Sequence, residues 1–191
     1  MARVSKEQSQ RNRETIVQVA SDLFRERGLA GIGVADLMGA AGLTHGGFYG
    51  HFASKDELAA EAATRAFKQV GDLWKGRTGT VEERTAAYQE SLTQYLRPVH
   101  RDASGQGCPM AALAADVARE PDDKPIREVF RRGIAESVET LAALSPEGRE
   151  GALRDLSLLV GTLILARASK GAAISDELLD AARKQLTETA E

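Results

Sequence analysis

The chain has 191 residues, of which 42% are hydrophobic and one, Cys108, is a cysteine. This apolar content is enough for a core, and a single cysteine excludes an internal disulfide framework and a structural zinc site. The longest uncharged apolar run, Leu156 to Ala166, is shorter than the roughly 18 residues that cross a bilayer, and the N-terminus lacks an apolar signal core. We therefore expect a cytoplasmic protein with no membrane contact, no metal and no cofactor.

The net charge of −3 is divided unevenly along the chain. Residues 1–55 hold seven Lys or Arg and five Asp or Glu, a net charge of +2, so the remainder carries −5. Because phosphate affinity depends on local cations more than on the total, the acidic balance does not exclude a nucleic-acid partner. Basic residues cluster before Glu14, where they would approach a phosphate strand as an N-terminal arm. A solvated tail is an equally good interpretation of this segment.

Apolar residues recur at helical spacing along nearly the whole chain, and no alternating strand pattern competes with them. We therefore predict an all-α protein. Gly28 ends the first helix, and Gly42 ends a short second helix, because glycine enters the left-handed region at little cost. The apolar stripe of the first helix is Ile16, Val19, Ala20, Leu23 and Phe24.

A third, short helix is predicted from Thr44 to about His51, with Thr44 as its N-cap. Only Phe48 and Phe52 would anchor it to a core, so one of its faces should be exposed. A long helix then begins at Ser54, because Ser54 and Glu57 have the spacing of a capping box. Its apolar stripe is Ala59, Ala62, Ala63, Ala66, Phe67, Val70, Leu73 and Trp74.

Five further helices are predicted in the C-terminal part. The first carries a stripe of Tyr88, Leu92, Tyr95, Leu96 and Val99, and residues 98–107 follow it as a loop. Pro109 suits the first turn of the next helix, which runs from Cys108 to Ala118. The remaining three are expected from Ile126 to Leu141, from Ser145 to about Lys170, and from Ser175, as an N-cap, through Leu178, Leu179, Ala182 and Leu186.

The residues from Thr15 to Leu58 resemble the helix-turn-helix domain of the TetR family of transcriptional repressors. The motifs that carry the resemblance are LFRERG at residues 23–28 and AGLTHGGFYGHFASKDEL at residues 41–58, and the range from Thr15 to Leu58 is about a quarter of the chain. The resemblance implies an N-terminal three-helix helix-turn-helix DNA-binding domain and a C-terminal helical domain for effector binding and dimerisation. The first would comprise residues 1–55 and the second residues 56–191, bridged by the helix from Ser54.

The resemblance also assigns roles within the motif. Residues expected to hold DNA phosphates are Tyr49, His51 and Lys55, and those expected to meet base edges in the major groove are Thr44, His45, Gly46 and Gly47. The paired glycines suggest close approach of the backbone to DNA; alternatively, they let two helices cross closely. Gly33 and Val34 replace the threonine or serine that often caps the second helix and contacts phosphate, so we expect moderate DNA affinity.

The penultimate helix is apolar on nearly every side, so more than one neighbour must cover it. We predict a homodimer in which this helix and the last helix pair with the same two helices of a second chain, in a two-fold four-helix interface. The residues expected in the interface are Leu156, Leu159, Leu163, Leu178, Leu179 and Leu186. The alternative is a central helix of a monomeric bundle.

In the resembling family, the C-terminal domain holds a small-molecule effector. The large or polar side chains expected around such a pocket are Trp74, Tyr88, Tyr95, Met110, Leu113, Phe130, Leu163 and Arg167, although helical stripes of this kind more often form plain core. The expected function is thus a ligand-responsive repressor that binds a palindromic double-stranded operator as a dimer and is released by an unidentified effector. An enzyme is not expected.

Cys108 supports an alternative hypothesis. A thiol at a helix N-terminus favours the thiolate, so Cys108 could sense oxidants or electrophiles. Its setting, Gln106 to Pro109, resembles a subgroup of these repressors that respond to reactive species. A small buried residue is the simpler interpretation. A remote third hypothesis is a thiol-dependent enzyme with His100 as base, but no orienting residue accompanies the pair.

Overall fold

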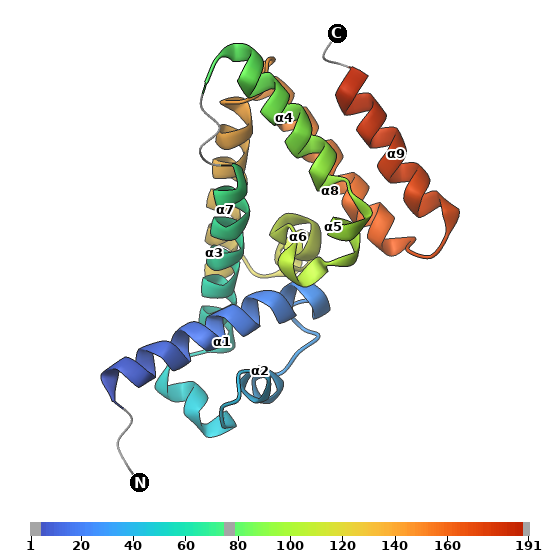
Figure 1. Cartoon of the computed structure of the whole chain (residues 1–191). Coiled ribbons are helices and arrows are strands. Elements are labelled where there is room, and N and C mark those ends of the chain that lie inside the picture. Colours follow the sequence, from blue (N-terminus) through green and yellow to red (C-terminus); the bar gives the residue numbers. More distant parts are fainter. Residues whose placement is uncertain (1–4, 75–78, 189–191) are drawn as a thin grey trace.

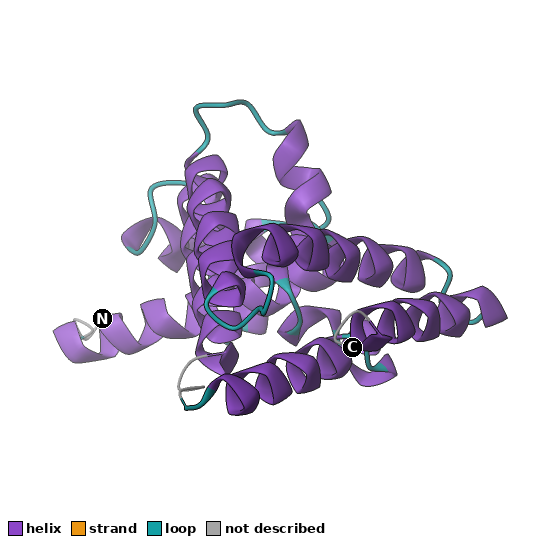
Figure 2. Ribbon diagram, turned by 90° about the horizontal axis from the view of Figure 1, so that it is seen from above, coloured by secondary structure: helices purple, strands orange, loops and turns teal. Residues whose placement is uncertain are grey.

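The computed structural model describes residues 5–74 and 79–188, and every regular element in these ranges is helical (Figure 2). The predicted all-α fold is confirmed. The elements are α1 (Lys6–Arg27), α2 (Val34–Ala40), the 3₁₀ helix η1 (His45–Gly50), α3 (Lys55–Trp74), α4 (Val81–Tyr95), α5 (Pro98–Asp102), the 3₁₀ turn η2 (Ser104–Gln106), α6 (Pro109–Arg119), α7 (Pro125–Ala142), α8 (Gly148–Ala168) and α9 (Ala173–Glu188). None of the described helices is long and apolar enough to span a membrane.

The helix ends in the N-terminal part lie where the sequence predicts them. Gly28 follows α1 with a φ of 77°, and Gly42 follows α2 with a φ of 71°, a region that other residues rarely adopt. The Ser54 hydroxyl accepts a hydrogen bond from the Glu57 N–H (3.1 Å) at the start of α3. The Glu57 carboxylate accepts from the Ala53 N–H (2.7 Å), one residue earlier than in the reciprocal capping box.

Figure 1 shows how the helices are arranged. Helix α1 crosses the lower part of the molecule, with α2 and η1 beneath it. Helix α3 rises from this unit and packs along α7, while α8 packs on α7 and α9. Helix α6 lies between α1 and α8 and contacts both. The N-terminal unit of α1, α2 and η1 therefore meets the rest of the chain along α3 and again through η2 and α6.

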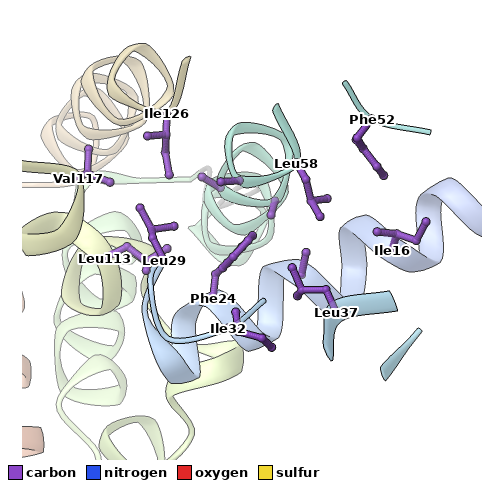
Figure 3. Close-up of a cluster of buried hydrophobic side chains, with 14 of the residues drawn as sticks. Ile16, Phe24, Leu29, Ile32, Leu37, Phe52, Leu58, Leu113, Val117 and Ile126 are labelled. Carbon is purple, nitrogen blue, oxygen red and sulfur yellow. The ribbon is translucent and has the colours of Figure 1, made fainter. Parts of the chain in front are cut away.

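Two clusters of buried side chains form the core. The first contains Ile16, Phe24, Leu37, Phe48, Phe52 and Leu58 together with Leu113, Val117, Ile126 and Phe130. Figure 3 shows Leu113 and Val117 of α6 beside Leu29, so this cluster crosses the predicted boundary at residue 55. The second cluster joins α4, α6, α7, α8 and α9, and Phe67 of α3 packs against both.

Several predictions for the C-terminal part were wrong. Residues 98–107 form α5 and η2, because Pro98 occupies the first turn of a short helix; Val99 on it is exposed. Helix α8 begins at Gly148 and ends at Ala168, inside the predicted range from Ser145 to Lys170. Ser175 lies within α9, where its hydroxyl donates to the Ala166 carbonyl (2.7 Å) and does not cap the helix.

Candidate nucleic-acid interface and ligand cavity

The segment from Thr44 to Phe52 is anchored by two phenylalanines. Phe48 and Phe52 are buried, with ring centroids 5.7 Å apart. Gly42 turns the chain after α2, and the Leu43 N–H donates to the Met38 carbonyl (2.9 Å). Thr44 occupies the N-cap position of η1 without a side-chain capping bond, so the predicted role of its hydroxyl was wrong. The anchors fix the segment and leave its other face open.

That open face carries most of the residues predicted to contact DNA. Thr44, His45 and Gly46 are exposed, and Tyr49 is 70% exposed although its neighbour Phe48 is 1% exposed. A Cβ added to Gly46 would meet nothing within 4 Å, and one added to Gly47 would make only ordinary contacts, the nearest with Met38 Cε at 3.7 Å. Helix crossing therefore does not require either glycine, and close approach of the backbone to DNA stays a prediction.

Lys55 and His51 are less accessible than the sequence suggests. The Lys55 ammonium donates to the Leu29 carbonyl (2.6 Å) and lies 5.8 Å from the centroid of the Phe24 ring. It therefore ties the α1–α2 loop to the start of α3, with two of its three N–H groups left for other acceptors. His51 is half-buried beside Phe52.

The basic residues before Glu14 that the structure describes lie on the first turns of α1, where Lys6 and Arg13 border a groove that the sequence analysis did not predict. Helix α1 and the end of η1 enclose an open polar groove of about 680 Å³, lined by Ser5, Lys6, Ser9, Gln10, Arg13, Gly50 and His51. Arg13 is paired with Glu61 and lies 4.6 Å from the centroid of the Phe52 ring, and Arg11 is paired with Glu7. Arg3, which belongs to the predicted arm, lies outside the described residues. The helical spacing of Lys6, Ser9, Gln10 and Arg13 is the signal that points to this groove.

A second candidate site is a cavity of about 340 Å³ between α3, α6, α7 and α8. Of the predicted pocket residues, Tyr95 and Met110 line it. Leu113 and Phe130 belong to the first core cluster, Leu163 to the second, and the Tyr88 hydroxyl donates to buried Asp155 (2.7 Å). These four do not line the cavity. The side chain of Trp74 lies outside the described part of the structure.

The sequence missed most of the cavity wall. The other lining residues are Thr64, Phe67, Lys68, Val70, Gly71, Cys108, Val129, Arg132, Gly133, Glu136, Ser137, Thr140, Leu141, Leu156 and Leu159. A Cβ on Gly133 would lie 2.6 Å from the Phe67 ring, so this glycine allows the ring to pack flat on α7. Helical periodicity alone does not separate a cavity wall from a filled core.

Polar groups gather at the end of the cavity near Cys108. The thiol is 1% exposed, and the buried Tyr95 hydroxyl faces it without a hydrogen bond of normal geometry. Burial raises the pKa of Tyr95 well above its ordinary value, and Cys108 adds to the shift, so the hydroxyl stays neutral. Arg167 does not line the cavity; it donates to the His100 and Arg101 carbonyls (both 3.1 Å), and its Nη1 has no partner among the described residues.

His100 is held by main-chain atoms on both sides of its ring. Nδ1 lies 2.7 Å from the Tyr95 carbonyl oxygen, and Nε2 accepts from the Cys108 N–H (3.1 Å), which assigns the neutral tautomer protonated at Nδ1. Burial lowers the pKa of His100, and Arg167 lowers it further, while the bond to Tyr95 opposes the shift. Neither nitrogen is directed at the thiol as a general base, which disfavours the thiol-dependent enzyme.

The predicted interface leucines lie mostly inside the chain. Leu156, Leu159, Leu163, Leu179 and Leu186 are buried in the second cluster, and only Leu178 is partly exposed. Because these five side chains are buried within their own chain, they are not available to a second subunit, whereas the assignment of Leu178 to the interface stays a prediction. The apolar side chains on the outer faces of these helices are instead Leu153, Ile164 and Leu165 of α8 and Ile174 of α9, each at least 40% exposed.

The family model "Bacterial regulatory proteins, tetR family" matches residues 16–62, which contain the anchored segment and its open face. DhaR, an HTH-type transcriptional repressor of Mycobacterium sp., is 27% identical over 143 residues, covering 74% of this chain and 70% of DhaR. NemR, an HTH-type transcriptional repressor of Escherichia coli, is also 27% identical over 143 residues, covering 72% and 69% of the two chains.

Solved structures match nearly the whole chain. The crystal structure of a TetR transcriptional regulator from Chloroflexus aurantiacus is 30% identical, with a TM-score of 0.72 and 95% of both chains covered. The reduced form of E. coli NemR has a TM-score of 0.70 at 21% identity and covers 93% of this chain and 96% of that one, which is evidence for the fold alone.

Proposed function

This chain belongs to the TetR family of bacterial regulatory proteins, and on that premise we propose that it is a ligand-responsive transcriptional repressor. In this proposal it binds a palindromic operator in the cytoplasm as a homodimer and leaves it when a small molecule occupies the cavity. The observation that carries the proposal is the open face of residues 44–49, exposed on a helix that Phe48 and Phe52 fix to the core. Its relatives are transcriptional regulators, and we assign the chain no catalytic role.

DNA contacts are proposed in two groups. Tyr49 and the polar groove between α1 and His51 would hold phosphates, because both lie beside the open face. Contacts to phosphates position a protein on DNA and do not read the base sequence. Thr44, His45, Gly46 and Gly47 would meet base edges in the major groove. Lys55 can join the phosphate contacts with the two N–H groups that its bond to the Leu29 carbonyl does not use.

The test is selection of a double-stranded fragment from a random library by the purified protein, followed by fluorescence anisotropy. Sequence-selective binding with a steep salt dependence supports the proposal, because phosphate contacts release counterions. Equal weak binding to selected and unrelated DNA contradicts it.

The homodimer is proposed to form through the outer faces of α8 and α9. The exposed apolar side chains Leu153, Ile164, Leu165 and Ile174 lie on these two helices, and a palindrome-reading helix-turn-helix needs two-fold symmetry. Leu165→Glu should give a monomer in light scattering and weaken operator binding. Val81→Glu, which places the same charge on an exposed valine of α4, is the matched control. A 20.5 kDa wild-type monomer at micromolar concentration would contradict the dimer.

The effector is proposed to be a small, mainly apolar molecule with one hydrogen-bond acceptor. The cavity volume of about 340 Å³ is within the range of small-molecule sites, and apolar side chains such as Phe67, Val129 and Leu156 form much of its wall. The Tyr95 hydroxyl has no partner among the described residues and offers a donor. A thermal-shift screen of small molecules tests this assignment. Compounds that carry a hydrogen-bond acceptor should raise the melting temperature of Tyr95→Phe less than that of wild type, whereas compounds without an acceptor should raise both equally.

Cys108 supports a second candidate, a repressor that senses electrophiles or oxidants. Cys108 is among the residues that line the cavity, so a molecule bound there would lie next to this side chain. An electrophile would form a carbon–sulfur bond with the thiolate, whereas a peroxide would oxidise the thiol to a sulfenic acid. Release from DNA by mild oxidant or electrophile should be absent in Cys108→Ser. Unchanged release from that variant would remove this candidate.

A further inference from the structure

One peptide unit joins the wall of the cavity to the DNA-binding motif. The Gly107 carbonyl accepts a hydrogen bond from Nη1 of Arg25, in α1, at 2.7 Å. The N–H of the same unit belongs to Cys108 and donates to Nε2 of His100 at 3.1 Å. The Cys108 side chain, one bond further along the chain, lines the cavity.

Arg25 is a buried guanidinium whose hydrogen bonds leave it little freedom. The residue is 3% exposed. Besides the Gly107 carbonyl, it donates to the Ser21 carbonyl (3.0 Å), the Ser21 hydroxyl (3.2 Å), Asp22 (3.0 Å) and Gln69 of α3 (3.1 Å). Losing the Gly107 carbonyl would leave a buried donor unpaired, so α1 is expected to follow any movement of that carbonyl.

The surroundings of the peptide unit also restrict it. A Cβ on Gly107 would come within 2.8 Å of both Arg167 and His100, so those side chains already fill the space around this residue. Gly105, two residues earlier, packs equally closely against Glu26 of α1. Because a peptide unit is planar and rigid, displacement of the Cys108 backbone moves the Gly107 carbonyl as well.

A second link joins α6, the helix that begins after Cys108, to the DNA-binding motif. Asp116 of α6 accepts from the Leu29 N–H (2.9 Å), in the loop between α1 and α2, and the Leu29 carbonyl accepts from Lys55 (2.6 Å). A shift of the α6 N-terminus is therefore passed to α1 at Arg25, and a shift of its body is passed to the α1–α2 loop and to the start of α3.

We propose that the Gly107–Cys108 peptide unit, held between Arg25 and His100, is the element that couples occupation of the cavity to the position of α1 and thereby to DNA binding. This inference rests on the proposed function. An occupant that presses on Cys108 displaces the unit, Arg25 follows its acceptor, and α1 moves relative to α3. By linkage, bound DNA lowers the affinity of the cavity for its occupant by the same factor by which the occupant lowers the affinity for DNA.

A tethered group tests the coupling without knowledge of the effector. Cys108 is the one cysteine of the chain, so benzyl methanethiosulfonate modifies a single site, where the thiolate displaces methanesulfinate and forms a mixed disulfide that dithiothreitol reverses. Modification is verified by mass spectrometry. Cys108→Phe places an aromatic group at the same position genetically. We expect the benzyl tether and Cys108→Phe each to give an affinity for a selected DNA fragment about tenfold below that of the unmodified wild type. A factor of ten is an ordinary size for allosteric coupling.

Arg25→Met is the decisive variant, because it keeps an unbranched apolar stem in place of the Arg methylenes and removes the guanidinium with every donor. The DNA affinity of the unmodified variant is measured first, because removing the guanidinium takes this donor from the Gly107 carbonyl, and the benzyl tether should change that affinity less than about twofold. Arg27→Met, an exposed position two residues further along α1, is the matched control and should retain the full response. A full response in Arg25→Met, or no response in modified wild type, would overturn the proposal.

Hydrogen exchange of the wild-type protein gives a readout that needs neither the variant nor DNA. Tethering should speed exchange at the Leu29 amide and in the last turn of α1, and unchanged exchange there would overturn the coupling. If wild type selects no DNA, the proposed function fails, while the exchange data still decide whether the cavity and α1 are coupled.

Discussion

The open face of η1 and the contact of α6 with α1 use polar groups in opposite ways. On the open face, Thr44, His45 and Tyr49 are exposed, and the backbone at Gly46 is bare. At the contact with α6, Arg25 and Asp116 are bonded within the protein, to Gly107 and Leu29. Groups without internal partners are available to an external ligand, whereas groups that are fully bonded fix the position of one element against another. The open face of η1 is suited to contacting an external ligand, and the contact of α6 with α1 is suited to fixing the position of α1.

The largest effect is expected from the anchor beneath the open face. Phe48→Ala should lower the free energy of unfolding by about 3–5 kcal/mol, because it removes a fully buried ring from the first core cluster. Urea denaturation monitored by circular dichroism measures this change. A loss below about 1 kcal/mol would mean that the ring does not fix the segment.

Gly46→Leu should separate DNA reading from folding. A Cβ at Gly46 has nothing within 4 Å, so the free energy of unfolding should change by less than about 0.5 kcal/mol. Binding to the selected DNA should weaken by about 1–3 kcal/mol, the range of a lost base contact. Unchanged affinity, measured by anisotropy, would exclude close backbone approach at this position.

Asp116→Ala should destabilise the contact between α6 and the α1–α2 loop by about 1–2 kcal/mol, because the Leu29 N–H loses its acceptor. Asp116→Asn keeps an acceptor oxygen and serves as the control. Thermal and urea unfolding of the two variants measure the difference, and equal stabilities would show that this bond does not hold the loop.

The smallest effect is expected from His100. Because burial lowers its pKa below the ordinary value of 6.5, the unfolded state binds the proton first as the pH falls. Stability should therefore decrease as the pH drops below 6.5 and level off below the pKa of the folded state. His100→Gln should show a shallower decrease between pH 7 and pH 5 in urea titrations, and identical pH profiles would contradict the neutral tautomer assigned here.

The sequence predicted the features that local chemistry determines. Gly28 and Gly42 end helices because of their backbone freedom, and Pro109 opens α6 because its missing N–H is not needed there. The open face of η1 was also foreseen, because Phe48 and Phe52 are its only large anchors.

Features that depend on tertiary packing were not foreseen. Helix α8 is apolar on nearly all sides, so its sequence did not distinguish Leu159, which faces the cavity, from Leu165, which faces outward. The roles of Arg25 and Lys55 were missed because their partners, the carbonyls of Gly107 and Leu29, are main-chain groups brought close only by the fold. Hydrogen bonds to a distant backbone carbonyl leave no pattern in the sequence.

The most direct test of DNA reading by the open face is the anisotropy of the wild type and of Tyr49→Ala on a selected DNA fragment over a series of salt concentrations. Tyr49 is exposed, so its loss should leave the fold intact and lower affinity about tenfold, while the salt slope stays near that of wild type because a neutral phenol releases no counterion. Affinity equal to that of wild type would contradict the assignment of the 44–49 face as the DNA-binding surface.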